Sequence, residues 1–272
     1  MPTAASADGA QVYYEVHGAG PALAFVHGTG GHHVAWWQQV VALGERFSVI
    51  TLDLPGFGCS PARVDPDGSP DVTGFDRDVI AVLQAADRGP AVVVGQSIGA
   101  ASALRAALAA PDLITDVVLA HSLAGMEHPV LTARVQADRA DAEQLPVLDR
   151  LLTPAFRAAQ PDKAFLFQQM GTFNRLKMSD LRKLFVGGPT VDEVRASGVS
   201  IGFLAGEKDA VLTPATVRAA ADLLPDAHVE IVPGAPHSMY FEAPELFNAA
   251  LDRLVQQFSA DRLPLAGSEV NA

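Results

Sequence analysis

The side chain whose setting most favours covalent chemistry is Ser97, which lies between two glycines in the pattern Gly-x-Ser-x-Gly. An apolar, β-branched run at 92–94 precedes the pattern, and an alanine-rich run follows it. This order predicts a strand, a sharp turn with the serine at its apex, and a helix. Glycine is expected at 95 and 99 because a Cβ there would collide with the backbone of so tight a turn. The segment therefore predicts a nucleophilic serine at the end of a strand.

A serine hydroxyl becomes an effective nucleophile when a base accepts its proton and a third group holds that base in the correct tautomer. His237 is the candidate base because it follows a strand expected over 229–232, in a loop rich in Gly and Pro. Asp209 is the candidate orienting acid because it comes shortly after a strand expected over 201–204. Glu207 competes for that role, but it occurs earlier in the same turn, so Asp209 is preferred.

Acyl transfer also requires two backbone N–H groups directed at the oxygen that becomes negative. Ile98 would supply one of them, as the residue that follows the serine. Thr29 would supply the other, from the glycine-rich segment 27–31. The glycines beside Thr29 allow the backbone to approach a substrate closely. Thr29 and Ile98 are therefore the predicted substrate-binding positions.

The elements that position these residues alternate along the chain. An opening strand over 11–16 is followed by buried strands expected over 22–26, 48–52, 92–94, 117–120, 201–204 and 229–232. These runs lack polar alternation, which is typical of parallel strands covered on both faces. Helical patterns separate them, with helices expected over 72–86 and 244–259. The alternation predicts an α/β fold with a doubly wound, mostly parallel sheet.

One interval, 122–199, interrupts this rhythm with short helical patterns separated by prolines. Ligands of open α/β sheets bind at the carboxyl ends of the strands, so an insertion that leaves from that edge would cover the site. We expect a core formed by 1–121 and 200–260, a helical cap over 122–199, and a loose tail over 261–272. The cap carries side chains that would roof an apolar pocket, namely Phe156, Phe165, Phe167, Met170, Phe173, Met178 and Phe185.

A basic cluster occurs in the same interval, formed by Lys163, Arg175, Lys177, Arg182 and Lys183. It would either attract a carboxylate or phosphate of a substrate or form a solvated helical face, and the second interpretation is preferred.

The composition restricts the class of partner. The chain has 272 residues and a formal net charge of −12, which argues against nucleic acid or an anionic membrane as its partner. Cys59 is its only cysteine, so no intrachain disulfide and no Cys/His zinc pattern is expected. No secretory leader and no run of 18 apolar residues is recognisable, which predicts a cytoplasmic protein. We expect a small-molecule substrate that is partly apolar, with no cofactor and no metal; the oligomeric state stays open.

Taken together, these segments resemble the α/β-hydrolase-fold superfamily, with a helical cap. The resemblance rests on the turn around Ser97, the loop 27–31, the loop 53–60 and the segments that end at Asp209 and His237. The order serine, acid, histidine is also that of these enzymes. The resemblance implies a serine hydrolase acting on an ester, lactone or thioester through an acyl enzyme.

Two alternatives remain open because this scaffold serves many reactions. The first is cleavage of a C–C bond, or a lyase or cyclisation step, on a keto-acid or β-keto substrate. The second is a ligand-binding protein that retains the scaffold without turnover.

Several other residues receive weaker expectations. His27 is expected to be structural, and His32 and His33 would either touch substrate or cap the helix that begins near residue 34. At least one of the adjacent Trp36 and Trp37 should pack in the core. Two further expectations concern Cys59, as a small buried residue, and His121, as either a pocket-lining or a core histidine.

Overall fold

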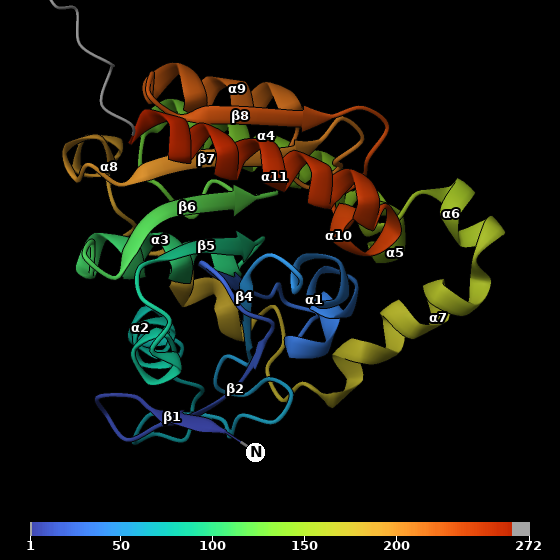
Figure 1. The fold of residues 1–272 in the computed structure, drawn as a ribbon. Helices are drawn as coiled ribbons and strands as arrows, with labels where there is room; N and C mark the ends of the chain where they lie inside the picture. Colours follow the sequence, from blue (N-terminus) through green and yellow to red (C-terminus); the bar gives the residue numbers. More distant parts are fainter. Residues whose placement is uncertain (1, 263–272) are drawn as a thin grey trace, which may run out of the picture.

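Eight strands form one sheet in the computed structural model, which describes residues 2–262 (Figure 1). In spatial order they are β1 (Thr3–Ala5), β2 (Gln11–His17), β4 (Ser48–Leu52), β3 (Ala22–Val26), β5 (Ala91–Gln96), β6 (Ile114–Ala120), β7 (Ser200–Gly206) and β8 (His228–Val232). The pairs β1–β2 and β2–β4 are antiparallel, and every other pair is parallel. This is the α/β hydrolase fold with the mostly parallel sheet that the sequence predicts.

Helices cover both faces of the sheet, which explains why the parallel strands are apolar throughout. On one face lie α2 (Phe75–Ala86), α3 (Gly99–Ala109) and α9 (Pro214–Leu223); on the other lie α1 (Trp37–Leu43), α10 (Met239–Glu242) and α11 (Pro244–Asp261). Alternate side chains of β3 enter the two cores: Ala24 and Val26 pack under α2 and α3, whereas Leu23 and Phe25 pack under α1 and α11. Burying a side chain such as Phe25 contributes about 2–3 kcal/mol to stability.

The interval between β6 and β7 is helical, as expected, and contains no regular strand. Its elements are α4 (Pro129–Glu143), α5 (Val147–Leu151), α6 (Pro154–Ala159), α7 (Pro161–Met170), the 3-10 turns η2 (Gly171–Phe173) and η3 (Asp180–Phe185), and α8 (Val191–Ala196). Three of its prolines begin helices, where the missing N–H has no partner to lose. Figure 1 shows α6 and α7 beyond the carboxyl ends of the strands, whereas α4 packs beside α9 and α8 lies near the start of β7.

Three local details differ from the sequence-based expectations. Strand β1 was not expected, because a segment of three residues is too short to show an apolar pattern. It forms by antiparallel pairing with β2. Helix α2 begins at Phe75 instead of Val72, since the Asp71 side chain accepts a hydrogen bond from the Thr73 backbone N–H and forms a turn there. The last helix continues through Asp261, and 263–272 lie outside the described residues.

Candidate active site

Ser97 occupies the strained turn between β5 and α3. Its φ of 52° lies in the left-handed region, which costs a non-glycine residue about 1–2 kcal/mol. The flanking glycines make the turn possible: a Cβ on Gly95 would lie 2.4 Å from Ala100 Cα, and one on Gly99 would lie 2.5 Å from the Val26 carbonyl oxygen. The side chain of Ser97 is thus held at the carboxyl edge of the sheet by backbone that tolerates only glycine on either side.

Asp209 and His237 meet at the same edge, after β7 and β8. His237 Nδ1 lies 3.0 Å from both carboxylate oxygens of Asp209, and both side chains are buried. Glu207 instead accepts a hydrogen bond from the Gly234 backbone N–H and is exposed. Within residues 2–262, no hydrogen bond joins the Ser97 hydroxyl to His237. The structure therefore brings the predicted acid and base into contact and places the serine at the end of β5 in the same sheet.

Asp209 is surrounded by hydrogen-bond donors. Its Oδ1 accepts the backbone N–H groups of Val211 at 2.8 Å and Leu212 at 3.0 Å. Burial by itself would raise the pKa of Asp209, but the charge interaction with His237 and the hydrogen bonds from His121 and His237 hold it well below the usual range. Asp209 is consequently ionised at neutral pH, as an acid that orients an imidazole should be.

The second imidazole on this carboxylate belongs to His121, a contact that sequence reasoning missed. His121 follows β6, is completely buried, and holds Nδ1 2.9 Å from Asp209 Oδ2. Burial lowers its pKa. Its position directly after a strand was a usable signal, because Ser97, Asp209 and His237 are placed by the same rule.

The loop expected to bind the oxyanion packs directly on the Ser97 turn. A Cβ on Gly28 would lie 2.0 Å from Gln96 Oε1, so a larger residue there would require the Gln96 side chain to move. Thr29 is partly exposed in a turn closed by the bond from Gly31 N to Gly28 O. Among the described residues, the backbone N–H groups of Thr29 and Ile98 have no acceptor within the protein. Neither amide is therefore occupied by a described protein acceptor, and their role in binding an oxyanion stays a prediction.

Asn174, from the segment after η2, connects this loop to its neighbours. Its Nδ2 donates to Gly31 O at 3.0 Å and to Thr29 O at 3.4 Å, and its Oδ1 accepts from Gly58 N at 3.2 Å. Met178 reaches the same place, with its sulfur 3.6 Å from Thr29 Oγ1. The helical interval therefore contacts the proposed oxyanion loop through specific side chains.

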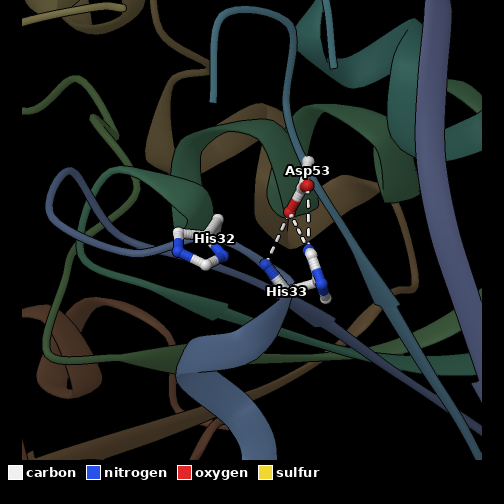
Figure 2. Close-up of side chains that lie close together, drawn as sticks. All are labelled: His32, His33 and Asp53. Carbon is white, nitrogen blue, oxygen red and sulfur yellow. Dashed lines mark hydrogen bonds and ion pairs between the residues drawn. The ribbon is translucent and has the colours of Figure 1, made fainter. Parts of the chain in front are cut away.

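Figure 2 shows how His33 and Asp53 join the loops after β3 and β4. Asp53 Oδ1 accepts the His33 backbone N–H at 2.5 Å, and His33 Nδ1 lies 2.9 Å from both carboxylate oxygens. Asp53 Oδ2 also accepts from Cys59 N at 2.7 Å. Burial would lower the pKa of His33, but its hydrogen bond to Asp53 raises it overall. His32 accepts the Val34 backbone N–H and so caps η1 (His33–Trp36), which is one of the two roles left open for this pair.

Of the remaining sequence expectations, those for His27 and the two tryptophans are confirmed and the one for Cys59 is not. His27 is structural: it is fully buried and accepts the Leu54 backbone N–H on Nε2 at 3.1 Å. Trp36 is in the core and Trp37 is exposed. The expectation for Cys59 was wrong, because the turn at Gly58, with a φ of 46°, leaves the thiol exposed instead of buried.

Two groups of side chains have the composition of cation ligands. Within residues 2–262, the first group is His32, His33 and Asp53, and the second is His121, Asp209 and His237. In each group the three residues offer one ligand atom each, and these atoms lie within 4.8 Å of one another. In both groups the carboxylate already accepts several N–H donors, which a cation would have to displace. Hydrogen bonding therefore accounts for both arrangements.

The site can be compared with known proteins on this basis. A model of the alpha/beta hydrolase family matches residues 23–250, a span that includes the turn at Ser97 and the Asp209–His237 pair. The chain belongs to this family. Within residues 2–262 of this α/β hydrolase, none of the helices combines the length and apolar character needed to cross a membrane.

Two curated relatives align along most of this α/β hydrolase. The 2-(acetamidomethylene)succinate hydrolase of Mesorhizobium japonicum is 25% identical over 250 residues, covering 88% of this chain and 89% of the relative. The pimeloyl-acyl-carrier-protein methyl ester esterase of Nitrosomonas europaea is 29% identical over 276 residues, covering 90% and 100%. Both are named as hydrolytic enzymes, in agreement with the family.

Solved structures show the same fold. A thermophilic esterase from Thermogutta terrifontis superimposes with a TM-score of 0.77 at 22% identity, covering 94% of this chain and 98% of the esterase. An enol-lactonase from Burkholderia xenovorans superimposes with a TM-score of 0.75 at 21% identity, covering 94% of this chain and 100% of the lactonase.

Proposed function

We propose that this hydrolase cleaves an ester, lactone or thioester bond through Ser97, His237 and Asp209. The observation that carries the proposal is the buried Asp209–His237 pair, 3.0 Å apart, at the sheet edge where Ser97 occupies a left-handed turn. An imidazole fixed by a carboxylate has one tautomer, with its proton on Nδ1, which leaves Nε2 free to accept a proton from the serine. The hydrogen bond between a catalytic serine and its histidine is often long without substrate and shortens when substrate binds.

The proposed reaction has two halves. Ser97 Oγ attacks the carbonyl carbon while His237 Nε2 accepts the hydroxyl proton, and the N–H groups of Thr29 and Ile98 stabilise the negative oxygen. The bond to the leaving oxygen or sulfur then breaks, and His237 donates its proton to that atom. In the second half, water attacks the acyl enzyme with His237 again as base, which releases the acid and restores Ser97. The substrate and one water supply every atom of the products, and Ser97 and His237 are restored at the end of the cycle.

We propose further that the interval 122–199 acts as a cap over this site and favours a substrate with an apolar part. Phe156 and Phe167 pack on Phe241 of the core, so these two side chains attach the interval to the core instead of lining a pocket. Phe173 and Met178 are 73% and 52% exposed, and Met178 lies against Thr29. The methyl ester and enol-lactone named for two similar proteins belong to the same classes of bond.

A panel of p-nitrophenyl esters, from acetate to long acyl chains, tests the proposal. We expect wild-type turnover with an optimum chain length, and a loss of at least about 1,000-fold in kcat for Ser97→Ala. Ser122→Ala is the matched control. Ser122 also follows a strand, but among residues 2–262 its hydroxyl bonds only the Ala124 N–H, so this variant should stay within a few-fold of wild type. Ester turnover that survives in Ser97→Ala would refute the proposal.

A different result would select one of the alternatives. Turnover of keto-acid or β-keto compounds without any ester hydrolysis would indicate C–C cleavage or lyase chemistry on the same residues. Binding of such compounds without multiple turnover would indicate a ligand-binding protein.

A further inference from the structure

His121 is a buried titratable group that contacts the proposed triad but has no part in the reaction just described. It is the first residue after β6 and adopts a φ of 57°, close to the 52° of Ser97 after the neighbouring β5. The two turns are connected, because the Ser97 backbone N–H donates to the Ala120 carbonyl at 2.9 Å. Non-glycine residues persist in this region only where the surroundings hold them there, and such residues gather at functional sites.

The hydrogen bonding of His121 determines its tautomer. Nδ1 lies 2.9 Å from Asp209 Oδ2, so Nδ1 carries the proton and donates it to the carboxylate. Nε2 is then a bare acceptor, and within residues 2–262 it is buried without a partner. A buried nitrogen without a partner destabilises a fold, and an apolar side chain would fill the same space without that cost. Packing alone therefore does not account for a histidine at this position.

What His121 adds is a donor for one particular oxygen. Asp209 Oδ1 is held by the backbone N–H groups of Val211 and Leu212 in addition to His237. Among the described residues, Oδ2 accepts only from His237 and His121. Without His121, Oδ2 would keep only the contact with His237, the ring that the carboxylate has to orient, whereas Oδ1 would keep its two backbone donors.

We propose that His121 is a positioning residue, whose Nδ1–H fixes Asp209 Oδ2 so that the carboxylate holds the His237 ring in its reactive orientation. This inference rests on the proposed function. His121 acts as a neutral donor: its ring centroid lies 5.4 Å from that of His237, so a charge on both rings would be repulsive when His237 accepts the serine proton. One carboxylate thus orients the catalytic imidazole and is itself oriented by a second imidazole.

Two variants separate donation from packing. His121→Asn places an amide N–H where Nδ1 is and keeps the donor, whereas His121→Leu fills the space and removes it. We expect kcat for a p-nitrophenyl ester to fall about 10- to 100-fold in His121→Leu, by analogy with the loss of a hydrogen-bond partner that orients a metal-binding histidine, with KM changed less than about threefold. His121→Asn should recover most of this loss. Melting temperatures of both variants show whether each is folded.

A spectroscopic readout makes the test independent of turnover. In nitrogen-15-labelled protein, the imidazole N–H protons bonded to Asp209 should give two far-downfield signals, one from each histidine. His121→Leu should remove one signal and displace the other, whereas His121→Asn should remove one and leave the other near its wild-type position.

Three outcomes would overturn the inference. They are equal loss of kcat in both variants, no loss in either, or an undisturbed His237 signal in His121→Leu. Failure of the proposed function is a separate result: it would appear as full ester activity in Ser97→Ala, and the displacement of the His237 signal would still decide whether His121 positions Asp209.

Discussion

Protonation of His27 should destabilise the fold by an amount that the structure defines. His27 is fully buried beneath the proposed oxyanion loop, and its Nε2 accepts the Leu54 N–H while its Nδ1 donates to Gly28 O. Only the Nε2 bond requires the neutral imidazole, because Nδ1–H can donate in either protonation state. Burial is the main reason that the pKa of His27 is lowered from 6.5 to about 4. Between those pH values the unfolded chain binds a proton that the folded chain does not, so stability decreases as the pH falls. The fall from pH 6.5 to 4 therefore lowers the free energy of unfolding by about 3 kcal/mol.

His27→Gln isolates this contribution, because the amide oxygen can accept the Leu54 N–H and does not titrate. We expect the difference in free energy of unfolding, wild type minus variant, to decrease by about 1.4 kcal/mol between pH 7.5 and 5.5, since 5.5 lies one unit below the unfolded pKa. Urea denaturation followed by tryptophan fluorescence measures it, because buried Trp36 becomes exposed on unfolding. A difference that stays constant over this range would show that His27 is not held neutral.

Three further substitutions test the packing around the site. Gly99→Ala should destabilise the protein by about 1–3 kcal/mol in urea denaturation, because its Cβ would lie 2.5 Å from the Val26 carbonyl oxygen. Gly30→Ala is the control, since a Cβ there would have no described atom of another residue within 4 Å. Equal losses of stability in the two variants would contradict the geometry. Asn174→Asp removes the donor to the oxyanion loop and should lower kcat/KM for esters about tenfold at unchanged melting temperature; an unchanged kcat/KM would count against the contact. Phe173→Ser should raise KM for long acyl esters but not for acetate, and a uniform change would argue against an apolar cap.

Much of the fold was predictable because local patterns determine it. Strands covered on both faces are continuous apolar runs, so β3 to β8 were recognised within a few residues of their observed ends. The turn at Ser97 was recognisable because steric contact permits only glycine at 95 and 99. Asp209 could be preferred to Glu207 from its place at the end of a strand turn, and in the structure Asp209 contacts His237 while Glu207 does not.

The contacts between distant segments were not predictable in this way. The position of His121 after a strand places it at the right edge of the sheet, but Asp209 is 88 residues away, and nothing in the neighbouring sequence shows that a left-handed backbone directs the ring to that carboxylate. Asn174 lies 145 residues from Thr29, in an interval whose helices carry no signal for the core loops they touch. The exposure of Cys59 depends on the turn at the preceding glycine, which composition does not reveal.

The most direct test of the central claim is to react the protein with a fluorophosphonate and locate the adduct by peptide mass spectrometry. Such reagents form a bond to a serine only where a base and oxyanion donors activate it. The account predicts a single adduct on Ser97, absent from Ser97→Ala and much slower to form in His237→Ala. An adduct on another residue, or none on the folded protein, would contradict the assignment of Ser97 as the nucleophile.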